Sequence, residues 1–161
     1  MLWLRGVIFT ILVPAVVAGY VPWTLSPRRL ASGYWQIGWV LVAIGAAIYL
    51  RCLVSFLAAR GTPAIFFSRG LRAIWGEEPP SLVQSSLYRF SRNPMYLGVL
   101  ILILGEALIY RSLPIALYAL GLFAFFHLLV VFVEEPHLRA REGPTYDDYR
   151  RRTHRWLGKG S

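Results

Sequence analysis

The chain has 161 residues, the length of a single domain, and 57% of them are hydrophobic. With a mean hydropathy of +0.52, this composition excludes an ordinary soluble domain and points to the membrane. The net charge of +9 comes from basic residues in the segments that flank the apolar runs, where such residues set the orientation of membrane helices. We therefore expect no nucleic-acid partner.

Four apolar runs are predicted to form transmembrane helices, at residues 7–25, 34–59, 94–110 and 113–133. A spanning helix needs about 20 residues, within a range of about 17–25. A backbone in hydrocarbon must satisfy its hydrogen bonds within helices or a closed barrel, and none of these runs alternates as barrel strands do. We therefore expect an all-α integral membrane protein of about four transmembrane helices, forming one domain.

The first run has an alternative interpretation as a cleaved signal peptide. Arg5 precedes it, and residues 16–18 resemble a cleavage site. Its length and its two prolines favour a retained helix. Four retained crossings place both ends of the chain on the same side of the membrane.

Basic residues predict the orientation of these helices. Five arginines lie in the loop at 60–92, and seven Lys or Arg follow Val133, whereas the other two connections carry few. By the positive-inside rule, the N-terminus, this loop and the tail at 134–161 face the cytoplasm. Two amphipathic segments, 65–75 and the tail, are expected to lie along the membrane surface, although 65–75 could instead contact substrate.

The last two apolar runs are joined by a minimal turn at Arg111 and Ser112. A turn this short makes the two helices antiparallel neighbours in a tight hairpin. The start of the third helix, around Arg92, and the end of the fourth, at Glu134 and Glu135, are therefore expected side by side at the cytoplasmic surface. Ionisable groups at that depth are costly, and by default they mark a functional site.

The start of the third helix has both a structural and a functional interpretation. Asn93 and Pro94 are residue types that commonly begin a helix, and this accounts for them without any function. Arg92 and Tyr96 lie about one turn apart, however, and can line one surface. The helix start adds free N–H groups and a positive dipole, which together suit an anion.

The end of the fourth helix carries the opposite charge. Glu134 and Glu135 adjoin where the helix dipole is already negative, so they require partners. Arginines such as Arg139 or Arg92 could pair with them as a simple membrane anchor. His127 lies about two turns deeper on the same face, where it could bond a neighbouring helix or belong to a site.

Together the two helix ends form a positive wall and a facing negative wall. A zwitterionic small molecule with a carboxylate at one end and a cation or hydroxyl pair at the other would suit them. S-adenosylmethionine has this pattern. No metal is expected, because Cys52 is the only cysteine and no ligand set with metal-binding spacing is present.

Several of these residues belong to a longer pattern, which comprises Leu82-Val83, Tyr88-Arg89, Arg92 to Tyr96, Glu134-Glu135, and Gly143 to Tyr149. The pattern resembles the isoprenylcysteine carboxyl methyltransferase family and, more loosely, the related membrane phospholipid N-methyltransferases. The resemblance covers residues 82–157 and implies a membrane-embedded methyltransferase without a Rossmann domain. It implies S-adenosylmethionine as the cofactor and a lipophilic molecule or lipid, entering from the bilayer, as the methyl acceptor.

The resemblance also implies which residues bind the cofactor. Those on the adenosine side would be Leu82, Val83 and Tyr88. Those around the methionine and ribose portions would be Asn93, Pro94, Met95 and Tyr96. Glu134 would accept hydrogen bonds from the cofactor.

This chain departs from the resembled family at two places. Val130 stands where the eukaryotic enzymes have an arginine that holds the prenylcysteine carboxylate, and Ser86-Leu87 stands where they have a glycine before the tyrosine. The first departure argues against prenylcysteine as the acceptor. Arg51, Arg89 or Arg92 could instead bind another anionic head group.

The candidate catalytic residues are Arg92, His127 and Glu135. A carboxylate acceptor needs no general base, whereas an amine must arrive neutral, and His127 or Glu135 could take its proton. Besides an isoprenylcysteine-type enzyme, two alternatives stay open. One is a phospholipid head-group N-methyltransferase, and the other is a non-catalytic membrane scaffold whose charged hairpin mouth is only an anchor.

Overall fold

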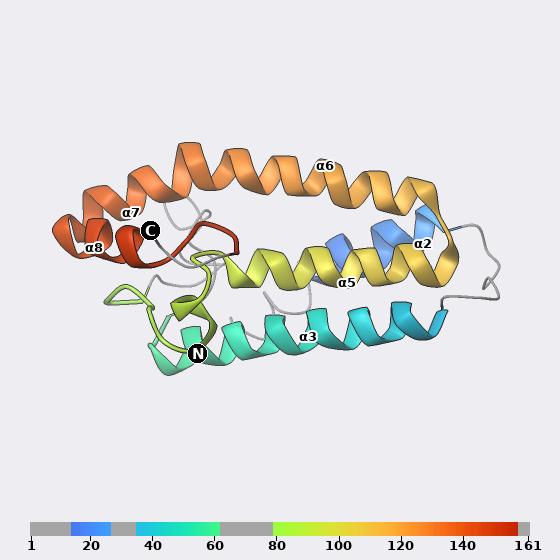
Figure 1. Cartoon of the computed structure of the whole chain (residues 1–161), viewed down its shortest axis with the longest axis horizontal. Coiled ribbons are helices and arrows are strands. Elements are labelled where there is room, and N and C mark those ends of the chain that lie inside the picture. Colours follow the sequence, from blue (N-terminus) through green and yellow to red (C-terminus); the bar gives the residue numbers. More distant parts are fainter. Residues whose placement is uncertain (1–13, 27–34, 62–78, 158–161) are drawn as a thin grey trace.

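The computed structural model describes residues 14–26, 35–61 and 79–157, and its regular elements there are all helices (Figure 1). In chain order they are η1 (Val16–Tyr20), α2 (Val21–Leu25), α3 (Trp35–Ala58), η3 (Ser86–Arg89), α5 (Pro94–Tyr110), α6 (Leu113–Leu129), η4 (Val130–Glu134), α7 (Glu135–Glu142) and α8 (Pro144–Arg152). The expected all-α class is confirmed. The expected surface helix at 65–75, the first part of the span at 7–25 and the last residues of the tail lie outside the described ranges.

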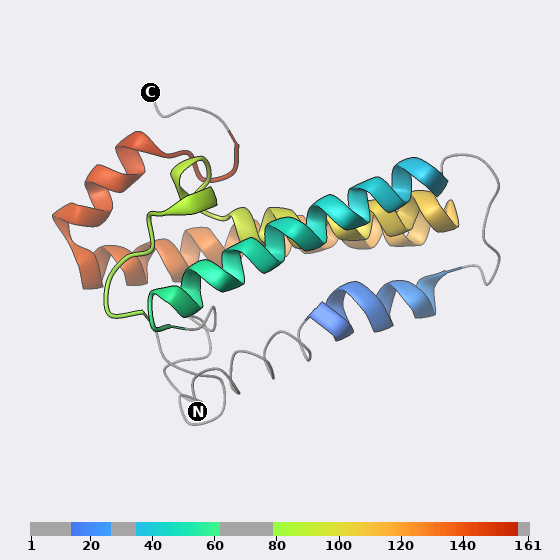
Figure 2. The ribbon, with the colours of Figure 1, turned by 90° about the horizontal axis from the view of Figure 1, so that it is seen from below.

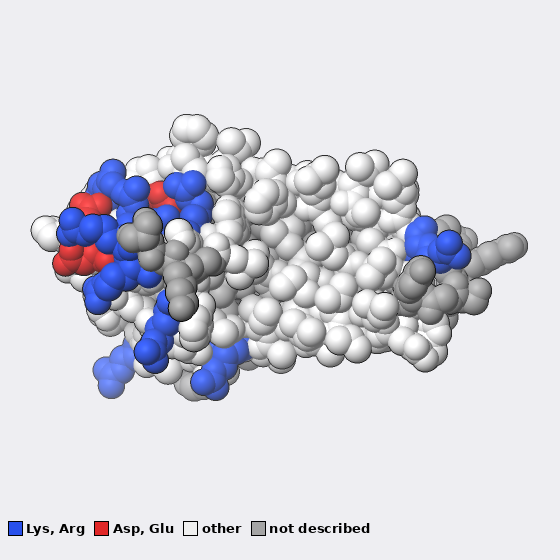
Figure 3. Space-filling view, in the orientation of Figure 1, with Lys and Arg blue, Asp and Glu red and all other residues white. Residues whose placement is uncertain are grey.

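Two helices of the described chain are long and apolar enough to cross a membrane. They are Trp35–Ala58, with 24 residues, and the continuous helix Leu113–Glu142, with 30. Val16–Leu25 and Pro94–Tyr110 are apolar but shorter, so four transmembrane helices stay a prediction. Large apolar side chains such as Phe132, which is 71% exposed, lie on the outside of the bundle. Figure 3 shows a broad band without charged residues between a large charged cluster at one end and a small basic patch at the other. Such an uncharged band is typical of a surface that lies in lipid.

α3 and α5 lie in close contact because glycines bring their backbones together. An ideal Cβ on Gly45 would lie 2.5 Å from the carbonyl oxygen of Gly98. One on Gly105 would lie 2.6 Å from the carbonyl oxygen of Gly38. Small residues at helix interfaces are typical of membrane proteins, where close backbone packing replaces the hydrophobic drive available in water. This contact sets how far α3 stands from the start of α5.

α5 and α6 are antiparallel neighbours, as the short turn between them predicts. The turn depends on Arg111, whose φ of 45° places it in the left-handed region at the end of α5. Ser112 then begins α6, and its Oγ accepts a hydrogen bond from the Ile115 N–H at 3.4 Å. Consequently the start of α5 and the far end of α6 lie at the same end of the molecule (Figure 1).

The helix that begins at residue 113 differs from the expectation, because it continues past residue 133 through η4 and α7 to Glu142. Pro136 explains the wider turn before it, since proline has no N–H and its ring displaces the carbonyl one turn back. The N–H of Glu135 bonds instead to the carbonyl oxygen of Val130, which is a π-type bond. The other π turn, η1, likewise comes just before Pro22. The carboxylate pair therefore lies inside a continuous helix and not at its negative end.

After α7 the chain turns at Gly143, where φ is 55°, and α8 folds back toward the bundle. Figure 2 shows α8 and the segment that follows it at the same end as the start of α5 and the end of α3. This end also holds the large charged cluster of Figure 3. It is the end where the candidate site lies.

Candidate functional site

The start of α5 forms one wall of the site and is tied to the end of the chain. Asn93 is at the N-cap position, but its side chain does not cap the helix. Its Nδ2 donates to the carbonyl oxygen of Arg155 at 2.9 Å, and its N–H donates to Ser91 Oγ at 3.1 Å. The N–H of Arg92 donates to the carbonyl oxygen of His154 at 2.9 Å. Asn93 is therefore positioned by contacts from residues distant in sequence as well as by its place at a helix start.

The π turn η4 forms the facing wall. A π turn bonds residues five apart, so the fourth and fifth residues after Val130, which are Glu134 and Glu135, both lie near its face of the helix. In a regular α-helix with about 3.6 residues per turn, adjacent side chains point about 100° apart. Val130 is 1% exposed and Glu134 is 7% exposed. The π turn thus allows two adjacent carboxylates to share one wall.

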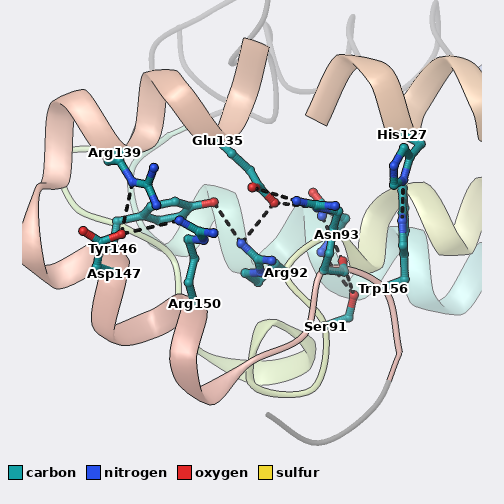
Figure 4. A network of polar contacts seen from close by, with 11 residues as sticks. Ser91, Arg92, Asn93, His127, Glu135, Arg139, Tyr146, Asp147, Arg150 and Trp156 are labelled. Atoms are coloured by element: carbon teal, nitrogen blue, oxygen red, sulfur yellow. Dashed lines mark hydrogen bonds and ion pairs between the residues drawn. The ribbon is translucent and has the colours of Figure 1, made fainter. Parts of the chain in front are cut away.

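The two glutamates have different polar partners across the site. The hydroxyl of Tyr96 donates to Glu134 Oε1 at 2.6 Å, and the Tyr96 ring stacks on Phe126 with a centroid separation of 4.4 Å. Glu135 contacts two arginines: Arg92 Nη1 lies 3.0 Å from its Oε1, and Arg155 Nε lies 2.7 Å from the same oxygen. Figure 4 shows Glu135 beside Arg92, with their ion pair as a dashed line.

Residues of the segment before α5 form a third wall around Tyr88. Its ring packs edge-on against Phe56 of α3, with centroids 5.6 Å apart, and its carbonyl oxygen accepts a hydrogen bond from the Tyr149 hydroxyl at 2.7 Å. Burial is the main cause that raises the pKa of Tyr88 well above 10, and the nearby Cys52 adds to it. The Tyr88 hydroxyl is therefore a neutral group at physiological pH.

Two tyrosines of α8 complete the enclosure, and neither is among the residues predicted for the site. Tyr146 is 2% exposed, and its hydroxyl accepts from Arg92 Nη1 at 3.3 Å. Burial, and after it the charge of Glu135, raises the pKa of Tyr146 to about 12, although Arg92 acts in the opposite direction. Burial likewise raises the pKa of Tyr149. The signal that could have found them was present, because both belong to the resembled pattern from Gly143 onward.

These walls enclose a cavity of about 500 Å³. Nine of the residues predicted for the site line it: Leu82, Val83, Tyr88, Arg92, Asn93, Met95, Tyr96, Glu134 and Glu135. The cavity extends from this polar region to apolar side chains of α6, including Leu122 and Phe125, and to Val17 of η1. Val130 also lines it, as do Tyr146 and Tyr149.

Four predicted residues are not among those that line the cavity. Pro94 is buried at the first turn of α5, where it begins the helix. His127 accepts a hydrogen bond at Nδ1 from Trp156 Nε1 at 3.1 Å. Arg51 donates from Nε to Ser86 Oγ at 3.0 Å, and Arg89 is exposed at the end of η3. The substrate roles expected for Arg51 and Arg89 and the proton-transfer role expected for His127 stay predictions.

The described residues contain no group of three or more His, Cys, Asp or Glu side chains that could hold a metal ion. What the site offers a ligand is instead a carboxylate, a guanidinium and several hydroxyls around an apolar space. Arg92 Nε is buried and has no hydrogen-bond partner among the described residues. A buried donor without a partner is costly, so a ligand that accepts from it would be favoured.

Comparison with protein families shows that residues 37–141 match the family described as phospholipid methyltransferase. The matched region is more than half of the chain and includes both facing walls, at Arg92 to Tyr96 and at Glu134-Glu135. Neither the curated proteins nor the solved structures include a match to this chain.

Proposed function

Because this chain belongs to the phospholipid methyltransferase family, and is therefore an S-adenosylmethionine-dependent membrane methyltransferase, we propose a role for its cavity. The cavity holds the cofactor beside the head group of a lipid-tailed acceptor. The observation that supports this most is the composition of the cavity wall. Charged and hydroxyl groups gather around Arg92 and Glu134, and apolar side chains line the remainder as far as Leu122 and Val17. A polar cofactor and an apolar-tailed acceptor need such a divided space.

The residues present fit S-adenosylmethionine. The volume of about 500 Å³ is within the range of about 300–1,000 Å³ that is usual for small-molecule sites. The buried Arg92 Nε, which lacks a partner among the described residues, suits the cofactor carboxylate. Glu134 suits a ligand hydroxyl or ammonium group, because Tyr96 occupies only one of its oxygens.

The predicted cofactor residues would then have distinct roles. Leu82, Val83 and Tyr88 would cover the adenosine, as the resemblance implies. Met95 and Asn93 would flank the methionine and ribose portions from the start of α5. Pro94 would act indirectly, by beginning the helix that presents them.

When bound, S-adenosylmethionine supplies a methyl group on a positively charged sulfur, which departs with the electrons of the broken carbon–sulfur bond. The protein has mainly to hold the reacting atoms in line and to exclude water. The enclosed apolar wall around Phe126 and Val130 serves the second purpose, since it surrounds the polar groups with low-dielectric surface.

The polar groups of the wall favour an amine acceptor over a carboxylate. Val130 is buried where the resembled prenylcysteine enzymes have an arginine, and neither Arg51 nor Arg89 lines the cavity. A protonated amine would be attracted to Glu134, which could accept the proton that the nitrogen must lose before it attacks the methyl group. We therefore favour the amine head group of a phospholipid, in agreement with the description of the matched family.

A carboxylate acceptor of the prenylcysteine type is the second candidate. Arg141 lines the cavity, and the resemblance at residues 82–157 is to enzymes that methylate a prenylcysteine carboxylate. The alternative of a non-catalytic scaffold is set aside, because the chain belongs to a family of enzymes.

The test uses purified protein in detergent or lipid nanodiscs. Calorimetric titration with S-adenosylhomocysteine should give specific binding, and tritium from labelled S-adenosylmethionine should enter phosphatidylethanolamine more readily than a farnesylcysteine analogue. Binding together with preferred labelling of the farnesylcysteine analogue would replace the amine by the carboxylate. Absence of S-adenosylhomocysteine binding by folded protein would contradict the assignment of the cavity to the cofactor.

A further inference from the structure

The segment Thr153 to Trp156, after α8, contacts residues on both walls of the site. Its carbonyl groups bind the start of α5: that of His154 accepts from the Arg92 N–H, and that of Arg155 accepts from the Asn93 side chain, both at 2.9 Å. Figure 4 shows Trp156 of this segment beside His127. The segment therefore connects two walls that the Tyr96–Glu134 hydrogen bond and the Arg92–Glu135 ion pair also join.

Trp156 anchors this segment to α6. Its indole N–H donates to His127 Nδ1 at 3.1 Å, and its ring lies 25° from the plane of the imidazole and 5.1 Å from the Phe123 ring centroid. Because His127 Nδ1 accepts this bond, its available nitrogen lone pair is occupied in the described structure. His127 thus fixes the depth at which the segment lies.

Arg155 is the residue of this segment that reaches the carboxylate pair. Its Nε and Nη2 donate to Glu135 Oε1 and Oε2 at 2.7 Å and 3.0 Å, which is a two-pronged contact. The Nη1 of Arg92 lies 3.0 Å from Oε1 of the same carboxylate. The side chains of Arg92 and Glu135 are only 10% and 11% exposed, so solvent screens this pair little.

This arrangement determines which part of Arg92 is free. Guanidinium and carboxylate groups prefer two-pronged pairing, and Glu135 can satisfy that preference for only one arginine at a time. Arg155 takes both oxygens of Glu135, and the Nε of Arg92 keeps no partner among the described residues. Without Arg155, Arg92 would be expected to turn toward Glu135 and use its Nε there.

We propose that Arg155 is a positioning residue for methyl transfer, which acts by occupying Glu135 so that the Arg92 Nε stays available to an anionic group of the bound ligand. The proposal rests on the proposed function, because that ligand group is taken to be the cofactor carboxylate. It also divides the roles of the adjacent carboxylates. Glu135 holds two arginines in place, and Glu134 is left to face the ligand.

The test measures kcat, the KM for S-adenosylmethionine and the affinity for S-adenosylhomocysteine in four proteins besides the unchanged chain. Arg155→Ala should raise the KM for the cofactor about tenfold or more, the range for one hydrogen bond to a charged group, and should change kcat less. Arg155→Lys keeps the charge but not the two-pronged contact, so its KM for the cofactor should lie between those of the unchanged protein and Arg155→Ala. Arg152→Ala is the matched control, because Arg152 is an exposed arginine at the end of α8 that does not line the cavity.

The fourth protein combines Arg155→Ala with Glu135→Gln, and it separates positioning from simple structural support. The neutral amide no longer draws Arg92 away, so the double variant should bind the cofactor several-fold better than Arg155→Ala alone. A double variant that binds the cofactor no better than Arg155→Ala, or a KM in Arg155→Ala equal to that of Arg152→Ala, would overturn the proposal. If Arg155→Ala does not fold, Arg155→Lys and Arg155→Lys with Glu135→Gln give the same comparison. Failure of the unchanged protein to bind S-adenosylhomocysteine would instead refute the proposed function.

Discussion

Replacement of Glu134 by alanine is expected to weaken cofactor binding while the fold is kept. Glu134 is 7% exposed, it lines the cavity, and its Oε1 accepts from the Tyr96 hydroxyl at 2.6 Å. The alanine variant removes the carboxylate that is proposed to accept hydrogen bonds from the cofactor. One such bond to a charged group contributes about 1.5–3 kcal/mol. Because about 1.4 kcal/mol corresponds to a factor of ten, the affinity for S-adenosylhomocysteine should fall about 10- to 150-fold.

The measurement is calorimetric titration in detergent, with thermal unfolding of each variant recorded alongside. Glu142→Ala is the matched control, since Glu142 lies further along the same helix, pairs with Arg141 and does not line the cavity. A double-mutant cycle with Tyr96→Phe adds a test of the geometry, because residues in direct contact usually couple by about 0.5–3 kcal/mol. Unchanged affinity in a folded Glu134→Ala protein would refute the cofactor assignment. Additive losses in the cycle would refute the Tyr96 contact.

Three further predictions concern packing, acceptor and topology. Gly45→Ala should lower the free energy of unfolding by about 1–3 kcal/mol, the usual cost of overpacking, because the added Cβ would lie 2.5 Å from the backbone of α5. An unchanged unfolding transition would show that the helices can separate freely. Val130→Arg should raise turnover of a farnesylcysteine analogue from a low level in the unchanged protein, and efficient methylation before the change would show that another arginine binds the carboxylate. Cysteines introduced at Ser68 and Ser112 in a Cys52→Ser background should be labelled from opposite sides of the membrane, and labelling from one side would contradict the four-helix arrangement.

The sequence determined the class of the fold and the pairing of the two site-bearing helices. Apolar runs of membrane length demand helices, since hydrocarbon offers no partner for a free backbone group. The minimal turn at Arg111 and Ser112 demands that the helices it joins be antiparallel, and the structure has them so. These two facts alone predict that the start of α5 and the pair Glu134-Glu135 lie at one end of the molecule, where the structure places them.

The tertiary structure decided how those residues are used. Pro136 is evident in the sequence, but the packing around it decides whether it ends the helix or widens a turn. Only the folded chain shows the π turn that puts both carboxylates on one wall. Asn93 is of a residue type that commonly begins a helix, yet its side-chain amide binds the backbone of Arg155, from a segment far along the chain. The indole of Trp156 likewise takes the imidazole nitrogen of His127. Contacts between distant segments leave no periodicity or spacing in a single sequence, because they depend on where α8 folds back, and that is set by the whole bundle.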